Sequence, residues 1–349
     1  MPPCPASHPW RSPVDVGAIV LAYGDQPYLV EVVDRILAST GVDVEVVVVD
    51  NGCTSPSLDP LRHRPGVLLL SPGTNTGFTG GCNLGAAATS APVLAFVNSD
   101  ALVEPDALAA LAEVARRPSV GLASASLRLA SDPTLLNTSG NPVHVLGLSW
   151  AGHLGEPAAD HAVEGPITSA TGAAVAARRE VWDALGGFTT EFFAYCEDAD
   201  LSLRCWQQGW DVVYVPTAVV AHHYEFGRNT AKFYLLERNR LAMVLSLWSR
   251  RTLLLLAPVL VAFELAMLAV AAAGGWLPAK LRGYRWLLGH RRWLRDHRRD
   301  VQSVRRRSDR ELAHLLTARF DQSVLPLPVG GGLLNAAMAG YWSVVRRLL

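Results

Sequence analysis

The sequence has few charged residues and few cysteines. Asp, Glu, Lys and Arg make up 18% of its 349 residues, whereas 50% are hydrophobic and the mean hydropathy is +0.20. A chain this apolar is neither intrinsically disordered nor collagen-like, and its length is enough for roughly two domains. The five cysteines lie far apart without a CxxC pair, which excludes a disulfide scaffold or zinc ribbon and favours reduced thiols in a cytosolic setting.

The first residues also lack the apolar core of a secretory signal. Residues 1–13 read MPPCPASHPWRSP, with three prolines among the first five positions. We expect this stretch to be a disordered tail.

Net charge is zero, but the zero is the sum of two strongly charged regions. Residues 1–230 contain 11 Lys/Arg and 24 Asp/Glu, a net charge of −13. Residues 231–349 contain 20 Lys/Arg and 7 Asp/Glu, a net charge of +13. This asymmetry predicts two regions with different partners. We place one domain at 14–230 and a helical region at 231–349.

Short apolar runs alternate with amphipathic stretches in the first region. Such alternation is typical of an α/β domain whose mostly parallel sheet is flanked by helices. Residues 125–170 have a less regular pattern, which predicts loops with one or two short strands. The expected strands are 16–23, 44–50, 67–70, 93–100, 171–177, 211–215 and 218–222, and the expected helices are 28–39, 82–89, 104–116, 179–185 and 198–208.

The helical region 231–349 is predicted to associate with a membrane. Residues 253–273 contain one charged residue, Glu264, and one proline, Pro258, and at about 1.5 Å per residue they could cross a bilayer. Residues 280–310 carry 12 Lys/Arg against 3 Asp. Because both flanks of the apolar segment are basic, a kinked element lying on an anionic inner leaflet is favoured over a span. A hydrophobic helix packed on the first domain is the alternative.

Polar residues follow several predicted strands, where open α/β sheets bind their ligands. Tyr23 follows the first strand and Asp50 the second, where a carboxylate could accept hydrogen bonds from a nucleotide. Asp100 follows the run VLAFVNS and could hold a divalent ion that bridges two phosphates. Turn or helix-cap roles are the alternatives for both carboxylates.

Residues 75–85 read NTGFTGGCNLG and form a glycine-rich stretch. The spacing matches neither a dinucleotide-binding GxGxxG nor a phosphate-binding loop with Gly-Lys-Ser/Thr. It predicts a loop and helix start that let a ligand approach the backbone closely.

Three carboxylates, Glu197, Asp198 and Asp200, fall at the start of a predicted helix. One of them could be the general base for a hydroxyl nucleophile, although acidic residues also favour helix starts for electrostatic reasons. His222 and His223 close the last predicted strand, where an imidazole could bind a metal ion or play a structural role.

The order of these motifs resembles the family 2 glycosyltransferases, which have the GT-A fold, and within them the bacterial rhamnosyltransferase-like branch. The resemblance extends from about residue 16 to about residue 240. It rests on IVLAY, VVVVDNG, NTGFTGGCNLG, VNSDALVEPDAL, TGAAVAARREVWDALGGF, FFAYCEDADLSLR and VPTAVVAHH.

The resemblance implies an inverting enzyme. It would move a rhamnose-like sugar from a nucleoside-diphosphate donor to a hydroxyl of a cell-envelope or lipid-linked glycan. Asp198 would be the general base, with Glu197 orienting it or the acceptor. Asp100 and His222 would hold a divalent cation, Mg or Mn. The residues implied in donor binding are Tyr23, Asp50, Asn75, Gly77, Asn83, Asn98, Asp100 and Arg204.

Three positions depart from the family pattern: Gly24 replaces an asparagine, Asn98 replaces the first aspartate of the metal motif, and Ser99 replaces a proline. A weaker ligand is therefore expected at residue 98.

Two other functions compete with this interpretation. A sugar-nucleotide nucleotidyltransferase would carry basic residues in the loop after the first strand, but the loop reads YGDQPY. A non-enzymatic adaptor on a membrane surface would explain the basic region but not the ordered motifs. Because the motif region is acidic, no nucleic-acid partner is expected. We expect a cytoplasmic protein, peripheral on the inner face of the membrane, with a span as the alternative.

Overall fold

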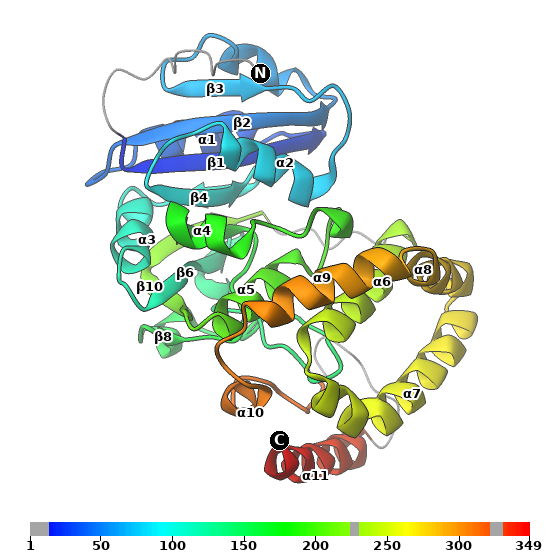
Figure 1. Ribbon diagram of the computed structural model, residues 1–349. Helices are drawn as coiled ribbons and strands as arrows, with labels where there is room; N and C mark the ends of the chain where they lie inside the picture. The colour runs from blue at the N-terminus through cyan, green and yellow to red at the C-terminus, as the bar shows by residue number, and fades with distance from the viewer. Residues whose placement is uncertain (1–13, 224–229, 322–330) are drawn as a thin grey trace.

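The computed structural model describes residues 14–223, 230–321 and 331–349; the predicted tail at 1–13 lies outside these ranges. A ten-stranded mixed sheet forms one end of the molecule and a group of helices forms the other (Figure 1). The strand order is β3-β2-β1-β4-β9-β6-β10-β5, with β7 paired to β6 and β8 to β10.

The bounds of the elements are as follows. The strands are β1 (Val16–Gly24), β2 (Val44–Cys53), β3 (Val67–Leu70), β4 (Val93–Asn98), β5 (Ala101–Val103), β6 (Val120–Leu129), β7 (Asp132–Thr138), β8 (Gly165–Pro166), β9 (Ala174–Arg178) and β10 (Asp211–His222). The helices are α1 (Leu29–Leu37), α2 (Gly77–Ala87), α3 (Ala107–Ala115), α4 (Arg179–Leu185), α5 (Glu197–Gln207), α6 (Thr230–Leu247), α7 (Arg250–Ala273), α8 (Leu277–Gly289), α9 (Arg291–Ser303), α10 (Asp309–Leu312) and α11 (Gly331–Leu348).

The continuous apolar runs form strands that are buried on both faces. β1 pairs in parallel with β2 and β4, and β2 with β3. Successive side chains of a strand point to opposite faces, so Val20 packs with α1 and α3, whereas Ile19 packs with α2, α4 and α5. The predicted α/β class with helices on both faces is confirmed.

Three local predictions were wrong. β6 (Val120–Leu129) is absent from the expected strands, and its last five residues, from Ala125 on, lie in the segment predicted to be mainly loops. The two strands predicted at 211–222 are one strand, β10, whose register with β6 shifts between Val215 and Val219. The expected helix at 82–89 begins at Gly77 instead.

Two glycines of α2 lie where this helix packs closely against β1. A Cβ atom on Gly81 would lie 2.2 Å from Leu21, and one on Gly85 would lie 2.5 Å from Ile19. Larger residues would therefore push α2 away from β1. Two of the glycines thus serve close packing of a helix on the sheet.

The C-terminal helices share a hydrophobic core with the elements around α5. One cluster joins Phe192 and Ala199 to Met243 of α6, Leu256 of α7 and Trp342 of α11. The proposed division at residue 230 coincides with the start of α6 but remains a prediction, because this core extends across it.

Helix α7 runs unbroken from Arg250 through Pro258 to Ala273 and ends before Gly274, and the kink expected of this segment stays a prediction. Within the described ranges it is the one helix that is long and apolar enough to cross a membrane, a criterion that core helices and signal sequences also meet. Its single internal charge, Glu264, forms ion pairs with Arg240 and with Lys280, the latter at 2.9 Å. The charge thus faces the protein.

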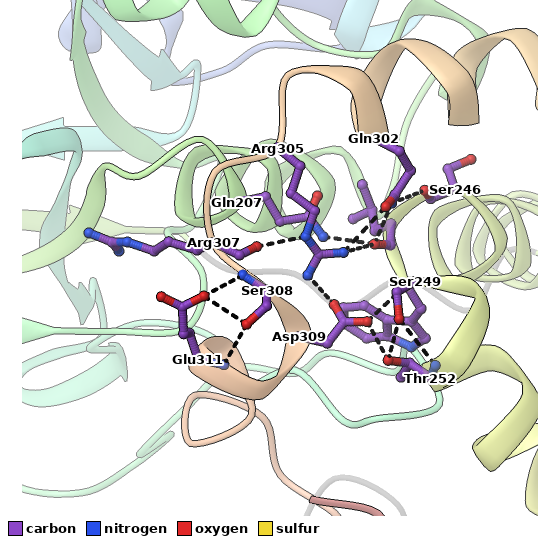
Figure 2. Close-up of polar contacts among 12 residues, drawn as sticks. Gln207, Ser246, Ser249, Thr252, Gln302, Arg305, Arg307, Ser308, Asp309 and Glu311 are labelled. Atoms are coloured by element: carbon purple, nitrogen blue, oxygen red, sulfur yellow. Dashed lines mark hydrogen bonds and ion pairs between the residues drawn. The ribbon is translucent and has the colours of Figure 1, made fainter. Parts of the chain in front are cut away.

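Part of the basic segment holds the helices together (Figure 2). Arg305 forms an ion pair with Asp309, which also accepts a 2.8 Å hydrogen bond from the backbone N–H of Ser249 at the start of α7. Arg307 pairs with Asp211 of β10 at 3.1 Å. These two arginines are therefore structural, although the sequence placed them in a membrane-binding segment.

Candidate active site

Asp100 and His222 meet at the end of the sheet. His222 is the last residue of β10 and pairs with Ala101 of β5, which places it beside the residue that precedes β5. The Asp100 carboxylate lies 3.2 Å from His222 Nε2, and His222 Nδ1 lies 2.8 Å from the side-chain oxygen of Asn137. An amide oxygen only accepts, so Nδ1 donates to Asn137, and Nε2 is the ring nitrogen that faces Asp100.

This donor set fits a divalent cation. The Asp100 carboxylate oxygen and the His222 Nε2 lie close enough to share one ion, and Asp100 remains 39% exposed, so phosphate and water ligands can reach it. Asn98 lies two residues before Asp100, and its backbone N–H donates to the carbonyl of Ala173 at 2.9 Å.

The turn before α5 has a strained backbone. Phe193, Tyr195 and Cys196 have φ values of 65°, 71° and 66°, in the left-handed region that non-glycine residues seldom adopt. Asn239 of α6 lies behind this turn, with its amide nitrogen 2.8–2.9 Å from the carbonyl oxygens of Phe192, Ala194 and Tyr195. The turn aims the first residues of α5, and α6 holds it in place.

Asp198 lies near the start of α5 and is half-buried. One carboxylate oxygen accepts a 2.8 Å hydrogen bond from the Ala199 N–H, and the other accepts a 3.3 Å bond from the Asn141 amide. Burial raises the pKa of Asp198, and these hydrogen bonds oppose the rise. A carboxylate with a raised pKa is a better proton acceptor near neutral pH.

Glu197 is buried beside Asp198. Among the described residues its Oε2 has no hydrogen-bond partner. Burial, together with the nearby charge of Asp198, raises the pKa of Glu197 to about 8. Glu197 therefore carries a proton at neutral pH, whereas Asp198 is the residue placed to accept one.

The raised pKa of Glu197 predicts a pH-dependent stability. The group titrates near 4.5 when unfolded and near 8 when folded, so the folded state binds the proton more tightly and stability falls as pH rises between these values. The slope from one group is at most about 1.4 kcal/mol per pH unit. Urea unfolding between pH 5 and 8 should show a shallower decline for Glu197→Gln. An equal decline in this variant would contradict the assignment, and the exposed Glu113→Gln should behave like wild type.

A short segment at the end of β7, residues 137–141, contacts both acidic parts of the predicted site. Asn137 contacts His222, and Asn141 contacts Asp198. Four residues span at most about 14 Å, so the asparagines that contact His222 and Asp198 lie on one short segment, and a site shared by Asp100 and Asp198 stays a prediction. Residues 172 and 173 link Asp198 to the strand before Asp100. A Cβ atom on Gly172 would lie 3.9 Å from that of Asp198, and the Ala173 carbonyl accepts a hydrogen bond from the Asn98 N–H.

Tyr23 and Asp50 lie together at the edge formed by β1 and β2. Ala22 is in register with Asp50, and Tyr23 is 58% exposed next to Gly52. Asp50 accepts a 3.0 Å hydrogen bond from the Cys53 N–H, which is the turn contact expected of an Asp-Asn-Gly sequence. Its role in donor binding remains a prediction.

The loop at residue 75 is tied to the end of β2 by Asn51, which we did not predict as a site residue. The Asn75 side-chain oxygen accepts from the Gly77 N–H at 2.8 Å and from the Asn51 amide at 2.9 Å. Gly77 has φ +74°, and a Cβ atom there would lie 2.4 Å from the carbonyl oxygen of Phe193, so the loop contacts the turn before α5.

Two predicted donor-binding residues are used inside the protein. The Asn83 amide donates to the Phe188 carbonyl at 2.8 Å and accepts from its N–H at 3.0 Å. Arg204 is 4% exposed, pairs with buried Asp200 at 2.9 Å and donates to the Gly187 carbonyl at 2.9 Å. Both residues hold the turn between α4 and α5, and direct contact with a donor stays a prediction for each.

Solved structures share this fold. The mannosyltransferase PcManGT from Pyrobaculum calidifontis, in complex with GDP-Man and Mn²⁺, aligns over 84% of this chain and 86% of its own with TM-score 0.50 and 20% identity. GalNAc-T7 with UDP, GalNAc and Mn²⁺ aligns over 69% of this chain and 49% of its own with TM-score 0.56 and 16% identity. The fold is thus GT-A, as predicted.

The sequence comparison names the family. The family described as "Glycosyltransferase like family 2" matches residues 13–244. The chain therefore belongs to the family 2 glycosyltransferases, and it is an enzyme. This membership decides against a nucleotidyltransferase and against a non-enzymatic adaptor.

Two curated relatives are named for rhamnosyl transfer and for O-antigen biosynthesis. N-acetylglucosaminyl-diphospho-decaprenol L-rhamnosyltransferase of Mycobacterium tuberculosis is 29% identical over 241 residues, covering 61% of this chain and 78% of the relative. The O-antigen biosynthesis protein RfbC of Myxococcus xanthus is 30% identical over 251 residues, covering 65% of this chain and 19% of the relative. The resemblance to the rhamnosyltransferase-like branch is confirmed.

Proposed function

We propose that this enzyme transfers a rhamnose-like sugar from a nucleoside diphosphate to a hydroxyl of a lipid-linked or cell-envelope glycan, with inversion. The observation that carries the proposal is the segment 137–141, which binds His222 through Asn137 and Asp198 through Asn141. The two contacts support a single site in which Asp100 and His222 would bind the cation and Asp198 would accept the proton.

The donor would lie along the ends of β1, β2 and β4. Exposed Tyr23 offers its ring for stacking on a nucleotide base, and Asp50 lies beside it to accept hydrogen bonds. Asp100 and His222 would hold the divalent cation, Mg²⁺ or Mn²⁺, which when bound neutralises charge on the leaving diphosphate. The structural neighbours solved with Mn²⁺ support this use of a cation.

Asp198 would accept the proton of the attacking hydroxyl. Its hydrogen bonds from Ala199 and Asn141 fix the carboxylate, while Glu197 stays protonated and adds no second negative charge beside it. A single base implies one displacement at the anomeric carbon, and therefore inversion. A retaining route with a covalent intermediate would need a second carboxylate as nucleophile.

A panel of donors tests this proposal. The purified chain is incubated with dTDP-, UDP- and GDP-sugars and with Mg²⁺ or Mn²⁺, and sugar release is measured with and without a lipid-linked acceptor. We expect a deoxyhexose donor such as dTDP-rhamnose to be the preferred substrate and hydrolysis to stop in EDTA. Equal inactivity with every donor and acceptor would contradict the proposal.

The acceptor side would face an anionic membrane on the cytoplasmic side. Leu254, Val261 and Leu265 of α7 are 76%, 59% and 63% exposed, and their spacing places them on one face of the helix. Helix α7 therefore presents apolar side chains outward while Glu264 faces the protein. Water solvates such a face poorly, whereas lipid chains bury it.

Basic residues lie next to this apolar face. A hollow of about 340 Å³ at the start of α7 is lined by Arg251, Arg306 and Arg310. Within the described ranges no carboxylate forms an ion pair with these three side chains. Lipid phosphates could form the ion pairs with these arginines. Each basic residue near an anionic surface contributes about 1 kcal/mol to binding.

The double variant Leu254→Glu/Leu265→Glu tests membrane binding. We expect at least a tenfold loss of partitioning onto anionic vesicles in a sedimentation assay, because a fully buried leucine contributes about 1.5–3 kcal/mol. Donor hydrolysis in solution should persist. Val163→Glu, at a site that is 82% exposed and off this helix, should bind vesicles like wild type. Unchanged partitioning of the double variant would exclude α7 as the contact.

A further inference from the structure

The segment between β7 and β8 gathers two histidines and a glutamate outside the site described above. His153, Glu156 and His161 each bring one ligand atom, and the three atoms lie within 4.8 Å of one another. His161 Nε2 is 2.7 Å from a Glu156 oxygen, and the His153 and His161 rings lie 4.1 Å apart between centroids. Imidazole nitrogen and carboxylate oxygen are ligands that zinc uses in proteins.

Backbone pairing with β7 positions these side chains. The Gly155 N–H donates to the Leu136 carbonyl at 2.8 Å, and the Leu136 N–H donates to the Glu156 carbonyl at 2.9 Å. His153, two residues before Gly155, has φ +60°, and its carbonyl accepts from the Glu156 N–H at 3.0 Å. A tight turn thus brings the ligands at 153 and 156 to the same place.

Ser139 orients the first histidine. Its hydroxyl lies 2.7 Å from His153 Nδ1. When Nδ1–H donates to this hydroxyl, Nε2 keeps its lone pair for a metal ion. Ligating histidines commonly donate their other ring N–H to a neighbouring oxygen in this way, which fixes the tautomer and the ring orientation.

The three side chains lie against one another. The His153 and His161 rings are tilted by 31°, and one ion shared between their lone pairs would join them. Glu156 supplies negative charge to the same ion.

We propose that His153, Glu156 and His161 bind a second metal ion of the zinc class, separate from the cation at Asp100 and His222. Three protein ligands leave one position for water or another ligand. The binding itself does not depend on the proposed glycosyltransfer. Its consequence for that reaction runs through Ser139, which lies between Asn137 and Asn141; the ion would brace the segment that joins the two parts of the active site.

A cobalt titration of the full chain tests the site. Excess Mg²⁺ is present to occupy oxygen-rich sites, and Co²⁺ is followed by its visible d–d absorption because nitrogen-containing sites prefer it to Mg²⁺. Because the Asp100–His222 pair also offers a ring nitrogen, the titration is compared with that of His222→Asn, in which we expect one equivalent to bind and to be displaced by Zn²⁺. His153→Asn and His161→Gln should each lower Co²⁺ affinity at least tenfold; asparagine tolerates the positive φ at residue 153.

Two controls separate this site from others. His63→Asn removes an exposed histidine elsewhere, and His222→Asn removes the histidine at the other cation site; both should keep the absorption. In EDTA, His153→Asn and His161→Gln should unfold at the wild-type temperature, and Zn²⁺ should raise that temperature only when the site is intact. Absence of the band in wild type, its loss in His222→Asn alone, or its persistence in both site variants would overturn the proposal.

Discussion

Replacing Asp198 with asparagine is expected to lower kcat for sugar transfer by roughly 10²–10⁴-fold, the range for removal of a general base. The amide keeps the size of the side chain and can still accept the 2.8 Å hydrogen bond from the Ala199 N–H, so the start of α5 should remain folded. It cannot accept the proton of the acceptor hydroxyl. Initial rates at saturating donor and acceptor measure the effect.

Two matched variants sharpen this experiment. Glu191→Gln removes an exposed carboxylate a few residues before α5 and should transfer sugar at the wild-type rate. Glu197→Gln retains the protonated form's shape and should lose less activity than Asp198→Asn. Near-wild-type turnover in folded Asp198→Asn, or a larger loss in Glu197→Gln, would assign the base to another residue.

Replacing Asp100 with asparagine is expected to reduce transfer by at least 100-fold and to abolish metal-dependent binding of the nucleotide. The substitution removes the negative charge that would hold the cation together with His222, whose Nε2 lies 3.2 Å from the Asp100 carboxylate oxygen. Thermal unfolding with a nucleoside diphosphate should show stabilisation of wild type only when Mg²⁺ or Mn²⁺ is present, because a ligand stabilises the state that binds it.

The control for this experiment is Asp106→Asn, which alters an exposed aspartate before α3. This variant should keep the metal-dependent stabilisation and the transfer rate. EDTA should reproduce the Asp100→Asn result in wild type. If nucleotide stabilises Asp100→Asn as strongly as wild type in the presence of metal, the cation is held elsewhere.

Much of the central sheet could be predicted because its signals are local. Val46 to Val49 lie in a continuous apolar run and are fully buried in β2, as expected of a strand covered on both faces. Continuous apolar runs and turn residues can be recognised from neighbouring positions alone. Polar residues that stand at the ends of apolar runs are visible in the sequence itself, which is why Asp50 and Asp100 could be named as candidates.

The parts that sequence reasoning missed have no local signal. Asparagines are common in turns, so nothing near Asn137, Asn141 or Asn239 indicates that they hold the site. Asn239 lies between Arg238 and Arg240 in a charged part of α6, so its neighbours do not mark it as a buried residue either. Its acceptors lie more than 40 residues away in the turn before α5.

By itself the sequence determined the α/β class, the family and the types of groups available for catalysis. Tertiary structure decided which of these groups meet. His222 contacts Asn137 across 85 residues of sequence, and Asp198 contacts Asn141 across 57. Arg204 faces the protein interior. Glu264 of the apolar helix α7 faces its ion-pair partners. Strand register and helix packing set these contacts, and both depend on the burial of side chains distant in the chain, which no local pattern encodes.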